Sequence, residues 1–104
     1  MQQRPPAPSI QLNDRGNWGP EHWEAFREQL EKNHVWPALY FFKFIVPHQK
    51  AAEVRLLFPL HECKEKSSAN GTYTSITYQM MMPGSLQVIE VYQKVRHIEG
   101  LIAL

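Results

Sequence analysis

The sequence predicts a single α+β domain, in which amphipathic helices pack on a small antiparallel sheet. Strand-like and helix-like segments alternate along a chain of 104 residues, which is the usual length of one domain. Asn70-Gly71 is a strong hairpin signal, because both residues tolerate the positive φ of a tight type I′ turn. The most β-prone run, residues 73–78, follows this turn directly. A hydrophobic content of 43% is enough for one core.

Residues 1–20 are expected to form a flexible, proline-rich leader. Four of the eight prolines stand here among Asn, Asp, Gly and Ser residues. Such a composition buries too little apolar surface to offset the entropy lost on ordering.

The first regular element is an amphipathic helix over residues 21–34. Trp23, Phe26 and Leu30 recur at spacings of three and four, while charged residues occupy the other faces. Pro20 suits the start of a helix, and Asn33 with Pro37 marks the end. We expect this helix to pack on or near the sheet.

The segment 38–46 is a strand with two apolar faces. Tyr40, Phe42, Phe44 and Val46 alternate with Leu39, Phe41 and Ile45, and only Lys43 interrupts the pattern. Because a strand that is apolar on both sides is normally covered on both sides, we expect the leading helix to cover Phe41 and its neighbours.

The remaining elements follow in order. A short helix over 48–58 ends at Pro59, and the lysine-rich segment 60–68 has the charge typical of an edge strand. The strand 72–82 turns Thr74, Ile76, Tyr78 and Met80 to one side and Tyr73, Ser75, Thr77 and Gln79 to the other. A helix is expected over 86–97, with Ser85 as its N-cap and Gly100 as the residue that ends it. Residues 101–104 are expected to form the last strand.

Residues 35–104 therefore have the order β-α-β-β-α-β, which is typical of the ferredoxin-like sandwich. In this topology the first and third strands are central, and the second and fourth lie at the edges. The apolar strands 38–46 and 72–82 suit the centre, and the charged segment 60–68 suits an edge.

From His34 onward the chain resembles the YbeD-like family of small bacterial proteins of unknown function. The features that carry the resemblance are Pro37, Phe42-Lys43-Phe44, Ser67-Ser68, Gly71, Tyr73, Ser75-Ile76-Thr77, Val91-Tyr92 and the tail from Ile98 to Leu104. The resemblance implies an ACT-like ferredoxin fold with an extra N-terminal helix, and it implies a regulatory role. It carries no catalytic residues.

Composition and spacing argue against several classes of function. A net charge of +1 counts against nucleic-acid binding, which usually needs a clear positive excess. Cys63 is the one cysteine, and a lone thiol suits a reducing cytoplasm. The start of the chain lacks the apolar core of a signal peptide, and no apolar run is long enough to cross a membrane. We therefore expect a soluble cytoplasmic protein.

No residue is assigned a catalytic, cofactor-binding or metal-ligating role. The five histidines lack the spacing of a metal motif, and only His61 and Cys63 stand close together on one strand. The acylphosphatases that share the ferredoxin-like scaffold need an arginine in the first strand-helix loop and an asparagine on the third strand. The loop here reads Val46-Pro47-His48-Gln49-Lys50, and the third strand has no asparagine.

The candidate binding face is the side of the sheet that faces away from the two crossover helices. Its predicted members are Leu39, Phe41, Lys43, Ile45, Tyr73, Ser75 and Thr77. An apolar face with one amine and three hydroxyls suits a partner protein, a small ligand or a second copy of the chain. We expect a non-enzymatic, ACT-like binding or regulatory module. The alternative is a weak single-stranded nucleic-acid binder that stacks bases on Phe41 and Tyr73 side by side.

Overall fold

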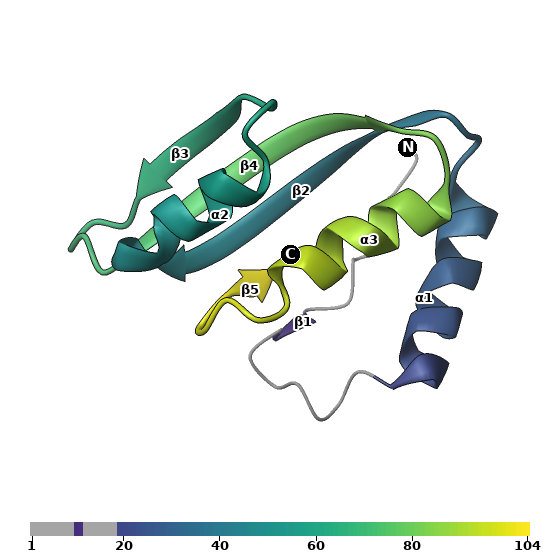
Figure 1. Cartoon of the computed structure of the whole chain (residues 1–104), viewed down its shortest axis with the longest axis horizontal. Helices are drawn as coiled ribbons and strands as arrows, with labels where there is room; N and C mark the ends of the chain where they lie inside the picture. The colour runs from purple at the N-terminus through teal and green to yellow at the C-terminus, as the bar shows by residue number, and fades with distance from the viewer. Residues whose placement is uncertain (1–9, 12–18) are drawn as a thin grey trace.

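The computed structural model describes residues 10–11 and 19–104 (Figure 1). Its elements in chain order are β1 (Ile10–Gln11), α1 (Pro20–Asn33), β2 (Ala38–Pro47), the 3-10 turn η2 (His48–Lys50), α2 (Ala51–Leu57), β3 (Cys63–Ser67), β4 (Tyr73–Met82), α3 (Ser85–Val95) and β5 (Ile102–Ala103).

The strands form one antiparallel sheet in the order β1-β5-β2-β4-β3. The α+β class is confirmed, and the long strands β2 and β4 lie at the centre as predicted. They pair along their whole lengths, from Ala38 opposite Met82 to Pro47 opposite Tyr73. The order β5-β2-β4-β3 is compatible with the ferredoxin-like class.

The leader departs from its expected lack of regular structure at one point. Ile10 and Gln11 form β1, which pairs with β5, so the last strand is not the edge of the sheet. The rest of the predicted flexible leader, residues 1–9 and 12–18, lies outside the described residues.

The core lies between the sheet and the helices α2 and α3, which Figure 1 shows on one side of the sheet. The predicted alternation is confirmed, because Tyr40, Phe42, Phe44 and Val46 of β2 are all buried. Thr74, Ile76, Tyr78 and Met80 of β4 are buried on the same side. The helices contribute Val54, Val88, Tyr92 and Val95, and Leu101 closes the core beside β5.

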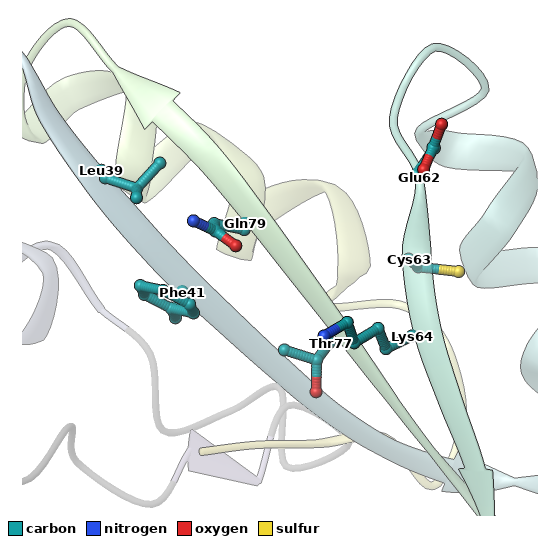
Figure 2. A pocket seen from close by; sticks show the side chains of 7 residues that line it. All are labelled: Leu39, Phe41, Glu62, Cys63, Lys64, Thr77 and Gln79. Atoms are coloured by element: carbon teal, nitrogen blue, oxygen red, sulfur yellow. The ribbon is translucent and has the colours of Figure 1, made fainter.

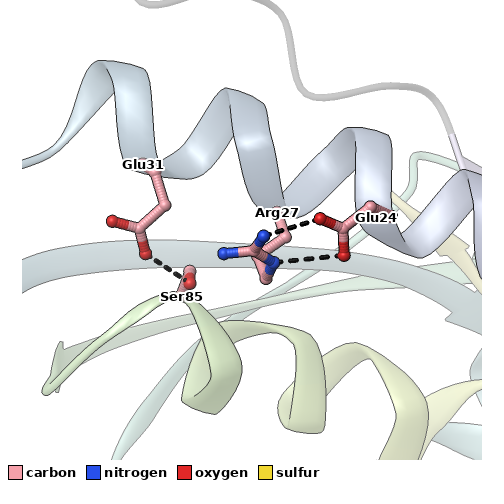
Figure 3. Close-up of polar contacts among 4 residues, drawn as sticks. All are labelled: Glu24, Arg27, Glu31 and Ser85. Atoms are coloured by element: carbon pink, nitrogen blue, oxygen red, sulfur yellow. Dashed lines mark hydrogen bonds and ion pairs between the residues drawn. The ribbon is translucent and has the colours of Figure 1, made fainter.

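The helix α1 lies with α3 and not on the second face of β2, so the prediction that it covers Phe41 is wrong. The Phe26 ring meets the Tyr92 ring edge-on, with the two centroids 5.4 Å apart. Ser85 Oγ at the start of α3 donates a hydrogen bond of 2.5 Å to Glu31 Oε2 (Figure 3). The residue after α1 explains why this helix lies on the same side of the sheet as α3. The ring centroid of His34 lies 5.5 Å from that of Tyr40, on the buried face of β2. The short link to β2 therefore holds α1 on the helical side.

The hairpin between β3 and β4 has a different turn from the predicted type I′. Among the described residues only glycines have positive φ, so Asn70 does not adopt the conformation that a type I′ turn requires. Within the hairpin only Gly71 has a positive φ, of 75°. Its N–H donates a hydrogen bond of 3.0 Å to the Ser68 carbonyl. The Asn70 side chain accepts instead, taking a hydrogen bond of 3.1 Å from the Thr72 N–H.

Candidate functional site

The open face, which is the side of the sheet away from α2 and α3, carries all seven predicted binding residues. Leu39, Phe41, Lys43 and Tyr73 are exposed, and Ile45, Ser75 and Thr77 are half-buried. No helix among the described residues packs on this face. The open face is therefore available to solvent along both central strands.

The register of β2 and β4 brings the middle of this predicted set together. Lys43 lies opposite Thr77, and Ile45 lies opposite Ser75. Directly opposed side chains in an antiparallel pair lie about 5 Å apart at Cβ, so the amine and the hydroxyls share one surface.

An apolar patch occupies the end of the open face where β2 begins. It consists of Leu39, Phe41 and Met81, which are 45%, 46% and 61% exposed. Leu39 lies directly opposite Met81, and Phe41 lies opposite Gln79. Met81 and Gln79 were not among the predicted binding residues, although the two-residue alternation of the strand was the signal that places both on this face.

Tyr73 lies at the other end of the face from Phe41. It pairs with Pro47, which is six positions along β2 from Phe41. Six residues of strand span about 20 Å. The prediction that Phe41 and Tyr73 lie side by side as a stacking platform is therefore wrong, because the register was not visible in the sequence.

Three lysines, Lys43, Lys64 and Lys66, outnumber the one glutamate, Glu62, that lines a hollow on the open face, so the face carries a net positive charge. Lys64 and Lys66 of β3 lie opposite Thr77 and Ser75, and so they point to the same side as Lys43. None of the three makes an ion pair within the part of the chain that the structure describes. Their amines are free to meet negative charge from a binding partner.

A hollow of about 420 Å³ opens on this face next to the apolar patch (Figure 2). Its lining residues are Leu39, Phe41, Glu62, Cys63, Lys64, Thr77 and Gln79. In Figure 2 the Lys64 side chain reaches from β3 toward Thr77 on β4, and Leu39 and Phe41 form the wall on β2. The hollow thus combines an apolar wall with the amine of Lys64, the carboxylate of Glu62, a hydroxyl and an amide.

Cys63 borders the hollow, but its sulfur atom points toward the helical side. Its partner in the sheet is the buried Tyr78, and its thiol lies 3.6 Å from Glu65 Oε2. Burial, with the nearby Glu65 carboxylate, raises the pKa of the thiol above its ordinary value. A protonated thiol is a poor nucleophile, so this setting does not favour catalysis by Cys63.

The same cluster ties β3 to α2. Arg55 Nη1 lies 2.7 Å from Glu65 Oε2, which places an ion pair across the helix and the edge strand. Desolvation by burial is the main reason that the pKa of Tyr78 is raised well above its ordinary value. Arg55, Glu65 and Tyr78 therefore interact on the helical side of the sheet, opposite the open face that carries Lys64 and Lys66.

Residues 10–11 and 19–104 contain no group of three His, Cys, Asp or Glu side chains that would suit a metal ion. In the same residues no helix has both the length and the apolar character needed to span a membrane.

Comparison with protein-family models, with curated proteins and with solved structures finds no match to this chain. The assignment of a function therefore rests on the geometry and chemistry of the open face.

Proposed function

We propose that this protein is a non-enzymatic binding module whose open face docks an acidic, partly apolar surface of a partner protein. The observation that supports this most directly is an exposed apolar patch on the same sheet face as three lysines that make no ion pair with any residue that the structure describes. Exposed large apolar side chains that lie together on a sheet are typical of interaction surfaces.

The size of the open face suits a transient partner. The ten residues of β2 span about 33 Å, and the three spacings from β5 to β3 add about 14 Å. The rectangle measures about 460 Å², and the sheet fills only part of it because β3 has five residues and β5 has two, so the face is smaller than the roughly 800 Å² that each partner buries in a stable complex. A regulatory contact that forms and dissociates matches this area.

Charge complementarity favours an acidic partner over a second copy of the chain. Lys43 stands at the middle of β2, so a two-fold axis through the centre of the open face would set two Lys43 amines against each other. Like charges across an interface are costly, whereas Asp or Glu side chains of a partner would pair with the lysines.

The scaffold supports a regulatory role. The strand order and the two helices on one side suit an ACT-like ferredoxin domain, and the residues shared with the YbeD-like family suit the same arrangement. The buried side of the sheet builds the core, and the open face is left for recognition.

The experiment is a titration with 8-anilinonaphthalene-1-sulfonate, a dye that is both anionic and apolar. Phe41→Ser should weaken binding about fivefold, because it removes about 1 kcal/mol of apolar burial. Lys43→Glu should weaken it as well, through the sulfonate. Leu86→Ser on α3 is the matched control, since Leu86 is a 61% exposed side chain away from the open face.

Equal dye binding by the wild type and Phe41→Ser would rule out the open face as the docking surface. A second titration, with single-stranded RNA at low salt, tests the nucleic-acid alternative. Tight RNA binding that Lys43→Glu abolishes and Phe41→Ser leaves intact would assign the face to nucleic acid.

A further inference from the structure

One edge of β4 is covered along only half of its length. β4 pairs with β2 over all ten residues, but β3 covers it only from Thr74 to Tyr78. On the β3 side, Gln79–Met82 have no strand partner among the residues that the structure describes. We call these four residues the free edge.

The polar backbone groups of the free edge point outward. The Tyr73 carbonyl accepts a 2.8 Å hydrogen bond from the Ser68 N–H, so the N–H and C=O of Tyr73 face the β3 side. Because these groups alternate along a strand, those of Gln79 and Met81 face the same way, past the end of β3. A strand placed there would find donors and acceptors at the ordinary sheet spacing.

The free edge adjoins the apolar patch and the hollow. Met81 and Gln79 belong to both the edge and the open face, and Gln79 lines the hollow. In Figure 2, β3 and β4 diverge toward Glu62, and the Lys64 amine reaches toward β4. Backbone pairing, apolar contact and a positive charge are therefore available within one short stretch.

We infer that an extended segment of the partner protein adds to the sheet as a strand along Gln79–Met82. The segment carries an acidic side chain at the end nearest β3, where it meets Lys64, and apolar side chains beside Met81. This inference rests on the proposed function and names how the partner docks. Strand addition draws affinity from main-chain hydrogen bonds and specificity from alternate side chains.

A second copy of the chain does not fit the free edge. Pairing Gln79 with Met81 of the copy would place the copy's Met82 opposite Tyr78, where Cys63 already lies. Pairing Met81 with Met81 of the copy leaves only Met80–Met82 in contact, which is three residues per chain. The overlap is too short to hold two copies together.

The leader of the same chain does not match the edge either. The leader, residues 1–20, contains one acidic residue, Asp14, and two arginines, Arg4 and Arg15, so it has no excess of negative charge for Lys64. The strand β1 also pairs at the opposite side of the sheet, beside β5. Lys43, Lys64 and Lys66 outnumber Glu62 beside the free edge, so a partner with acidic residues is the occupant that the net charge favours.

The test uses the full chain, labelled with ¹⁵N, and a blocked six-residue peptide of sequence Glu-Val-Thr-Val-Thr-Val. The peptide should shift the amide resonances of Gln79 and Met81 and slow their hydrogen exchange. Met81→Pro should weaken binding about fivefold, because it removes one outward N–H. Proline is tolerated at a sheet edge, so the pairing with β2 should persist. Met81→Leu, which keeps the N–H, is the matched control and should bind as the wild type does.

A twin peptide methylated at every backbone nitrogen provides a second measurement that requires no change in the protein. It keeps the charge and the side chains but has no N–H to donate, so it should not bind. Strand addition is wrong if two results are found together: the methylated peptide binds the wild type as well as the unmethylated peptide does, and Met81→Pro binds the unmethylated peptide as well as the wild type does. Docking on the open face would still stand.

The remaining outcomes also decide the inference. No shift at millimolar peptide would overturn strand addition, and the dye titration then decides the proposed function separately. A wild-type dimer that Met81→Pro converts to a monomer would identify a second copy as the occupant and overturn the inference as well.

Discussion

Two glycines among residues 10–11 and 19–104 have a left-handed backbone, but they differ in their surroundings. Gly71 has φ of 75° in the hairpin, and a Cβ there would meet no atom within 4 Å. Gly100 has φ of 81° after α3, and a Cβ there would lie 2.9 Å from Pro47 Cγ. A side chain at Gly100 would therefore meet both a strained backbone conformation and the Pro47 ring, whereas a side chain at Gly71 would meet only the strained conformation.

We expect Gly100→Ala to destabilise the fold more than Gly71→Ala does. The hairpin variant should lose about 1 kcal/mol of unfolding free energy through backbone strain. The Gly100 variant should lose at least about 1 kcal/mol more, because the Pro47 ring has to move. Urea denaturation of both variants measures the difference. Equal losses would show that the contact with Pro47 has no cost.

Stability should fall at alkaline pH because of Tyr78. Its folded pKa is raised by burial, while the unfolded residue titrates near 10. Above pH 10 the unfolded chain therefore binds fewer protons than the folded chain, and the unfolding free energy declines by up to about 1.4 kcal/mol per pH unit. Below pH 9 this group should have no effect.

Tyr78→Phe should make that alkaline decline shallower. Urea denaturation at pH 8, 10 and 11 compares the variant with the wild type, and Tyr73→Phe at an exposed position serves as the control. An unchanged slope between pH 10 and 11 would show that Tyr78 does not contribute.

At the scale of elements, the position of α1 was the main departure from the sequence prediction. The amphipathic pattern correctly identified Phe26 and Leu30 as buried residues. It did not identify their neighbours, because a helix periodicity shows which side is buried and not against what. The contact with Tyr92 and the hydrogen bond to Ser85 place α1 against α3 (Figure 3).

The Glu31–Ser85 contact should contribute to this docking. We expect a double-mutant cycle with Glu31→Ala and Ser85→Ala to give a coupling energy of about 1 kcal/mol, as for a hydrogen bond with a charged acceptor. Glu28→Ala on an exposed position of the same helix should change stability by less than about 0.5 kcal/mol. A coupling near zero would mean that apolar packing alone holds α1.

The second face of β2 shows a similar limit of the sequence pattern. Leu39, Phe41 and Ile45 are apolar, which predicted a covered strand, yet Leu39 and Phe41 are exposed. A strand shows the same alternation of apolar residues whether its second face is covered by the same chain or is exposed for a partner. The seven residues of the candidate binding face lie on one face of the sheet, while the predicted cover by α1 is wrong.

At the scale of the whole molecule, the C-terminal strand joins distant parts of the chain. Leu101 and Ala103 are buried, and β5 pairs with β2 on one side and β1 on the other. The Leu104 N–H also donates to the Lys43 carbonyl at 2.9 Å. The predicted pairing of residues 101–104 is confirmed for Ile102–Ala103, with one further hydrogen bond from Leu104, whereas Leu101 lies outside the strand.

Removing residues 101–104 should lower the unfolding free energy by at least about 3 kcal/mol, since it exposes a buried leucine and frees two strands. For a domain of this size that loss corresponds to a melting temperature lower by about 12 °C or more. Deletion of Leu104 alone, which is 44% exposed, should have a smaller effect. A truncated chain that melts like the full one would show that β5 is not needed for stability.

The sequence by itself determined the helices, the strands β2 to β5 and the sides of β2 and β4 that face the core, but it did not predict β1. Alternation in β2 and β4 and the spacing of Phe26 and Leu30 are local properties, because a side chain's direction follows from its position in a strand or helix. The order of segments was enough to predict the α+β class and the two central strands.

Only the tertiary structure decided which residues of neighbouring strands lie opposite each other. The separation of Phe41 from Tyr73, the gathering of Lys43 with Lys64 and Lys66, and the free edge of β4 all depend on register and strand length. These depend on contacts between residues that are distant in the chain, which no local pattern encodes. The candidate site is therefore a product of pairing between strands, and its residues acquire a common role only in the folded sheet.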